Sequence, residues 1–164
     1  MTFDPISGAP VTRGRLTPAG AQDIVIPVAD GENNGEVRAR GILVGDSGTD
    51  RNLTIFINGA ATNVLLQEMA ASGATGGLAG NTVIGQFDSN CAYVDMVVWT
   101  KTGTRRFGHV RVIWNLGASG TSLFEAAFVY DDASTVITSI GLRANFATGF
   151  AAGTAVVYEE FRLP

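Results

Sequence analysis

The chain has few charged residues, and it contains one lysine and one cysteine. Charged residues occupy 16% of its 164 positions, against roughly a quarter in an average globular protein. Lys101 is the only lysine and Cys91 the only cysteine, which excludes an intrachain disulfide and a thiolate metal cage. Eleven basic residues against fifteen acidic ones give a net charge of −4, so we expect no general nucleic-acid-binding surface.

Long hydrophobic runs are also missing. No run approaches the roughly 18 apolar residues of a membrane helix, and the first residues do not resemble a signal segment, so we expect no membrane association. A hydrophobic share of 46% nevertheless rules out a disordered chain. The few charged residues can solvate only part of the surface of a folded chain. We therefore expect some of the remaining surface to face another protein. The alternative is an exterior rich in Thr, Ser and Gly.

Alternation of apolar and polar residues is the dominant pattern, and helical stripes are missing. The alternation predicts strands over nine segments without helices between them, which favours an all-β, antiparallel β-sandwich over residues 23–164. The segments are 23–28, 36–44, 52–57, 82–87, 92–101, 106–114, 122–130, 134–144 and 154–163. Residues 1–22 contain Pro5, Pro10 and Pro18, which predict an extended N-terminal arm; a frayed terminus is the alternative.

Two predicted strands, 92–101 and 122–130, are apolar on both faces. A strand of a half-solvated antiparallel sheet has a polar outer face, so these two are either central and covered or part of a subunit interface. For the interface we predict Tyr93, Val97, Trp99, Leu123 and Val129.

The usual signatures of catalysis and metal binding are weak. Residues 45–48 read Gly-Asp-Ser-Gly, but the only histidine, His109, lies far downstream, so a protease triad is not expected. Residues 30–35 begin like a calcium loop and lack the carboxylate at its twelfth position. We therefore expect no enzyme, no metal and no cofactor. A local basic cluster is either a solvated face or an anion- or glycan-binding patch; it contains Lys101, Arg105, Arg106, His109 and Arg111.

The C-terminal part resembles a known kind of domain. Ile137-Thr138-Ser139-Ile140-Gly141-Leu142 is followed by Phe150-Ala151-Ala152-Gly153-Thr154 and by Val157-Tyr158. This series is similar to the closing segment of small β-domains in structural proteins of tailed-bacteriophage particles, most closely over 135–158. The segment 64–67 and the first strand depart from that pattern. The resemblance implies a jelly-roll-type sandwich in a virion protein that is often oligomeric, and it implies no catalytic residue.

We therefore expect a virion structural protein, assembled in the host bacterial cytoplasm as a homo-oligomer, with a trimer as the expected state. A surface decoration or cement protein fits a single domain with an arm. The arm would bind the major capsid protein or another virion protein through Phe3, Pro5, Ile6, Arg13 and Arg15. Two alternatives stay open: a receptor- or glycan-binding fibre module, with Tyr93, Trp99 and the basic cluster as its platform, and an enzyme with an unrecognised site.

Overall fold

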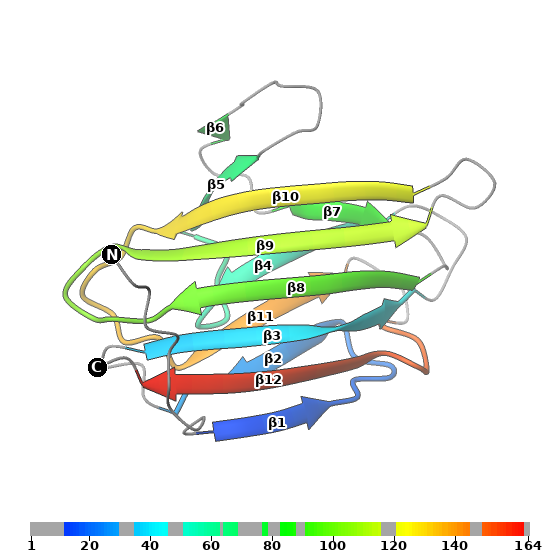
Figure 1. Ribbon diagram of the computed structural model, residues 1–164, viewed down its shortest axis with the longest axis horizontal. Coiled ribbons are helices and arrows are strands. Elements are labelled where there is room, and N and C mark those ends of the chain that lie inside the picture. The colour runs from blue at the N-terminus through cyan, green and yellow to red at the C-terminus, as the bar shows by residue number, and fades with distance from the viewer. Residues whose placement is uncertain are drawn as a thin grey trace, which may run out of the picture.

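The computed structural model describes residues 12–29, 35–45, 51–62, 64–68, 77–78, 83–87, 91–115, 121–144 and 149–162. Within these ranges the regular elements are twelve β-strands in two antiparallel sheets, and no helix there could span a membrane. The two sheets lie over one another (Figure 1). The prediction of an all-β, sandwich-like fold is confirmed.

The large sheet has eight strands, and their order in the sheet differs from their order along the chain. The chain enters at one edge with β1 and returns beside it with β12, whereas β8, β9 and β10 follow one another as a meander. The order is β1 (Thr12–Leu16), β12 (Ala155–Arg162), β3 (Gly35–Val44), β8 (Cys91–Trp99), β9 (Arg106–Asn115), β10 (Thr121–Tyr130), β5 (Val64–Glu68) and β6 (Gly77–Leu78).

The small sheet has four strands and covers the large sheet from one side. Its order is β2 (Asp23–Pro27), β11 (Ser139–Ala144), β4 (Arg51–Ile57) and β7 (Val83–Phe87). The core lies between the sheets, because alternate residues of each strand point inward. Fully buried examples are Ile24, Ile55 and Leu142 from the small sheet and Val94 and Val110 from the large one.

The turn after β4 has the chemistry that the sequence suggests. Asn58 has a φ of 52° and Gly59 a φ of 79°, and Ile57 and Ala60 exchange backbone hydrogen bonds across them. The Asn58 side chain also accepts hydrogen bonds from the backbone amides of Thr138 (2.8 Å) and Ser139 (3.1 Å). This turn therefore fixes the start of β11 against the end of β4.

Glycine stands opposite an aromatic ring at several cross-strand positions. Gly108 faces Phe128 between β9 and β10, and Gly141 faces Phe56 between β11 and β4. A Cβ atom would lie 2.1 Å from the Phe128 ring at the first position and 1.9 Å from the Phe56 ring at the second. Each ring thus lies flat on the glycine of the next strand, an arrangement known to compensate for glycine in sheets.

The predicted N-terminal arm differs from the structure in part. Thr12–Leu16 forms β1 and pairs with β12 over its full length, so the large sheet begins at residue 12 rather than at residue 23. Pro18 follows this strand by two residues and has no backbone N–H to donate to a strand ladder. Residues 1–11, with Phe3, Pro5 and Ile6, lie outside the described residues.

Candidate functional site on the outer face of the large sheet

The outer face of the large sheet, turned away from the small sheet, carries large apolar side chains. In β8, Val94, Met96 and Val98 point into the core and are at most 1% exposed. Tyr93 and Trp99 alternate with them and are exposed on the other face. The sequence alternation therefore assigned the two faces of this strand correctly.

One row of apolar residues crosses the sheet from β3 to β10. Cross-strand pairing joins Ile42 to Tyr93, Tyr93 to Ile113 and Ile113 to Leu123. Ile42, Tyr93 and Leu123 are 48%, 38% and 53% exposed. We call these four residues the Tyr93 band. Side chains directly opposite each other on neighbouring strands are in contact range, so the band forms a continuous apolar surface.

A second apolar row lies nearer the opposite ends of the same strands. Phe107 pairs with Val129, and Val129 pairs with Leu65. Trp99 continues the row on β8, and it lines a hollow of about 500 Å³ together with Phe107, Lys101, Thr104 and Arg105. We call Trp99, Phe107, Val129 and Leu65 the Trp99 band. The predicted interface residues thus lie on one face and divide between the two bands, with Val97 on the same face between them.

The polar residues that β9 and β10 carry between the bands pair with one another. Glu125 on β10 accepts a hydrogen bond from Arg111 Nη2 at 3.0 Å and lies 2.9 Å from His109 Nε2. The hydrogen bond from Arg111, helped by the contact with His109, holds the pKa of Glu125 below its ordinary value, although burial acts the other way. His109 and Arg111 therefore do not form a free anion-binding patch.

The other three residues of the predicted basic cluster, Lys101, Arg105 and Arg106, all line the hollow beside Trp99, but Arg106 is buried. Arg106 is 1% exposed and points to the inner face, because it stands one residue out of phase with Phe107 in the alternation. Its guanidinium lies 5.1 Å from the centre of the Tyr130 ring and donates to the backbone carbonyls of Asp132 and Thr135. Arg105 forms an ion pair with Asp131 at 2.7 Å. The inclusion of Arg106 in the predicted surface patch is therefore wrong, and Arg106 has a structural role.

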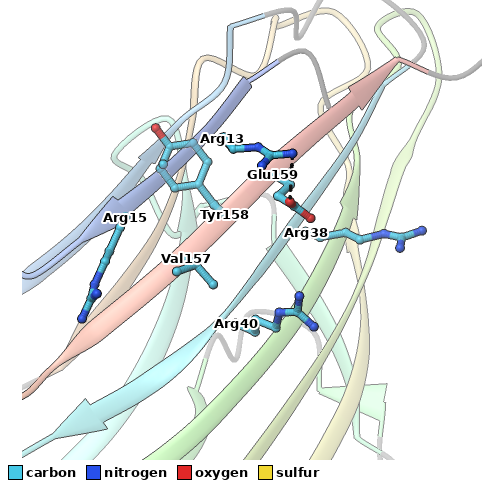
Figure 2. Close-up of a pocket in the computed structure, with 8 residues that line it drawn as sticks. Arg13, Arg15, Arg38, Arg40, Val157, Tyr158 and Glu159 are labelled. Carbon is cyan, nitrogen blue, oxygen red and sulfur yellow. Dashed lines mark ion pairs between the residues drawn. The ribbon is translucent and has the colours of Figure 1, made fainter. Parts of the chain in front are cut away.

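A different group of arginines meets at the β1 edge of the same face. β1 and β3 each contribute two arginines, and β12 runs between these strands (Figure 2). The side chains surround a hollow of about 320 Å³. We call it the arginine hollow; its outward residues are Arg13, Arg15, Arg38, Arg40, Val157 and Glu159.

The four arginines differ in their partners. Arg13 Nη2 lies 3.9 Å from Glu159 Oε1, and Arg38 forms an ion pair with the buried Glu36 while stacking over Phe161. Arg15 and Arg40 have no ion-pair partner among the described residues. Sequence alternation could not predict the arginine hollow, since its arginines come from two strands and its Val157 and Glu159 from a third, and only the pairing of β1, β12 and β3 brings them together.

Two further expectations concern catalysis and metals. Where the chain is described, no group of three or more His, Cys, Asp or Glu side chains is placed to hold a metal ion. Most of the segments 30–35 and 45–48 lies outside the described residues. No protein-family model matches the sequence, and no curated protein matches it either. The resemblance to phage β-domains therefore stays a prediction.

Proposed function

We propose that this chain is a non-enzymatic structural protein of a tailed phage or phage-like particle, a decoration or cement protein that assembles as a homo-oligomer, with a trimer as the expected state. The observation that carries the assembly is the pair of exposed apolar bands on one sheet face. Extended apolar patches on a folded protein mark interaction surfaces, and aromatic residues are enriched in interface cores. In this proposal a sister copy packs on both bands where they cross β9 and β10, and Ile42 and Tyr93, at the β3–β8 end of the Tyr93 band, lie at the rim of that interface.

We also propose that the sandwich is of the jelly-roll type. Eight of the strands pair as a nested series: β1 with β12, β2 with β11, β3 with β8 and β4 with β7. One outer pair and one inner pair then join in each sheet, through β12 with β3 and through β11 with β4. A jelly roll has eight strands in two sheets with nested pairs of this kind. The remaining strands β5, β6, β9 and β10 extend the large sheet.

The location on a phage particle rests on the resemblance over 135–158. The local structure is compatible with it: Phe150 is fully buried, and Gly153, with a φ of 97°, makes the turn into β12. The proposed anchor is the N-terminal segment, whose position is fixed where β1 starts at the edge of the large sheet. We propose that residues 1–11 bind the major capsid protein or another virion protein.

Light scattering on the purified chain tests the assembly. We expect a mass of about three times 17.1 kDa, and any stable oligomer supports the proposal. The variant Leu123→Glu places a charge in the Tyr93 band and should weaken association at least ~10-fold, because an unpaired charge in an interface core is costly. Val25→Glu is the matched control, since Val25 is similarly exposed (47%) but belongs to the small sheet. A monomeric wild type would refute the assembly; equal effects of both variants would refute this surface.

Deletion of residues 1–11 tests the anchor and leaves β1 intact. The shortened protein should keep its oligomeric mass and lose attachment to particles that lack their own decoration protein. Undiminished attachment would contradict the anchoring role of this segment.

A glycan-binding module is the second candidate function. It is favoured by the 500 Å³ hollow in which Trp99 and Phe107 lie beside Lys101 and Arg105. Trp99→Ala should then abolish glycan binding while the oligomeric mass stays the same. No glycan binding by the wild type, or loss of the oligomer together with binding, would contradict this function.

A further inference from the structure

Two parallel rows of side chains form the arginine hollow, and only one of the rows contains an acidic residue. Cross-strand pairing gives the first row as Arg13, Glu159 and Arg38, and the second as Arg15, Val157 and Arg40. Glu159 stands between two arginines in the first row. Val157 occupies the equivalent position in the second row, where it is 42% exposed between Arg15 and Arg40 (Figure 2).

Arg15 and Arg40 are consequently two cations around an apolar floor. Neither forms an ion pair within the described residues, and Arg40 stays unpaired even though Asp95 is its cross-strand neighbour on β8. A protein with a net charge of −4 has no general excess of cations, so two unpaired arginines facing one position are not a consequence of composition. In the first row the acid belongs to the protein: Glu159 Oε1 lies 3.9 Å from Arg13 Nη2, whereas Arg38 pairs with Glu36.

An apolar hollow continues from this point along the sheet. It measures about 440 Å³ and shares Arg15, Arg40 and Val157 with the arginine hollow. Its further lining includes Ile42 and the exposed ring of Tyr93. A ligand in the combined hollow thus meets guanidinium groups at one end and an apolar, aromatic surface at the other.

We propose that the arginine hollow binds an acidic sugar through its carboxylate. The carboxylate lies over Val157 and accepts charge-assisted hydrogen bonds from Arg15 and Arg40, as guanidinium groups favour. The sugar ring lies against Ile42 and Tyr93, since ligand sites combine an apolar lining with a few well-placed polar groups. The site lies within one copy of the chain and goes beyond the proposed assembly, which it does not require.

The sheet geometry favours a sugar over an acidic peptide. Extended peptides are commonly bound by main-chain hydrogen bonds to an open strand edge. Here β12 is paired on both sides, with β1 and β3, and β3 is paired with β12 and β8. The floor of the hollow therefore offers side chains alone, which suits a compact ligand with one charged group and one ring face.

Calorimetric titration with sialyllactose, and with lactose as its neutral match, tests the proposal; a glucuronic acid disaccharide and cellobiose form a second pair. At least one acidic sugar should bind, its neutral match should bind at least ~10-fold more weakly, and raised salt should weaken the binding. Val157→Glu supplies the missing acid from the protein itself and should abolish binding, whereas Val157→Thr should keep it. Arg15→Gln with Arg40→Gln should also lose binding, and Arg143→Gln, on the small sheet, should not.

The outcomes separate the possible ligands and the two proposals. Equal binding of acidic and neutral sugars, or binding that survives Val157→Glu, would overturn the site. Binding of inorganic phosphate or of a glutamate-rich peptide, with none of either acidic sugar, would overturn the assignment to a sugar. The assembly variant Leu123→Glu should bind the acidic sugar as the wild type does, so a failed assembly and a failed binding site give different results.

Discussion

Gly108 lies where the structure leaves no room for a side chain. A Cβ atom there would be 2.1, 2.3 and 2.7 Å from three atoms of the Phe128 ring. Ordinary van der Waals contact between carbon atoms needs about 3.5 Å or more, so the ring has to move by more than 1 Å. Phe128 is 2% exposed and packed among core side chains, which leaves it no free direction.

Gly108→Ala should therefore destabilise the protein, although glycine to alanine in a strand normally reduces the entropy of the unfolded chain and stabilises slightly. Overpacking costs ~1–3 kcal/mol. For a chain of this size we expect a fall in Tm of roughly 2–12 °C. Urea unfolding at one fixed protein concentration measures the change, because self-association also shifts apparent stability.

The double variant tests the cause of the effect. Phe128→Leu alone loses core packing, but in the double variant with Gly108→Ala it also removes the clash. The double variant should be less destabilised than the sum of the single variants, by about 1 kcal/mol or more, because residues in contact couple. Additive effects, or a neutral Gly108→Ala, would show that the ring does not lie on the glycine.

Two further predictions concern turns. The hydroxyls of Thr135 and Ser134 donate to the Asp132 carboxylate and hold its pKa well below the ordinary value. Asp132 therefore stabilises the folded state above pH ~4, and this stabilisation fades as the pH falls further. The stability difference between wild type and Asp132→Asn, measured by urea unfolding, should be constant from about pH 5 to 8 and shrink below about pH 4; a difference unchanged at about pH 2 would contradict this. Asn58→Ala removes the side-chain acceptor for two backbone amides in a residue with positive φ and should cost ~2 kcal/mol. Asn58→Gly also removes the acceptor, but glycine adopts a positive φ without strain, so this variant should lose less stability. A larger loss for Asn58→Gly than for Asn58→Ala would refute the role of strain.

Local alternation was enough to predict most strands and their faces. β8 and β9 alternate between core and exterior as their sequence indicates, and the Asn58-Gly59 turn has the conformation that this pair favours. The same alternation assigns Arg106 to the inner face, so its burial could have been predicted from its position relative to Phe107. Grouping it with its exposed basic neighbours ignored that phase.

Other features depend on pairing between distant residues. β1 is five residues long between prolines, and it becomes a strand because β12 offers its free edge. β6 has two residues, too few for any periodic pattern. Cys91 is exposed at the start of β8. Glu160 is 1% exposed and accepts a hydrogen bond from the Ala29 amide, 131 positions away, at 2.9 Å.

The charges on the outer face determine which part of it suits a sister copy. An interface core that buries an unpaired charge is strongly penalised, whereas charges already paired within one copy are covered at a lower cost. Around β9 and β10 the charges of Arg111 and Glu125 are paired within the chain, His109 lies 2.9 Å from the same carboxylate, and both apolar bands flank these residues. Around β1 the arginines Arg15 and Arg40 are unpaired among the described residues. We therefore place the assembly interface over β9 and β10 and leave the arginine hollow open to a ligand.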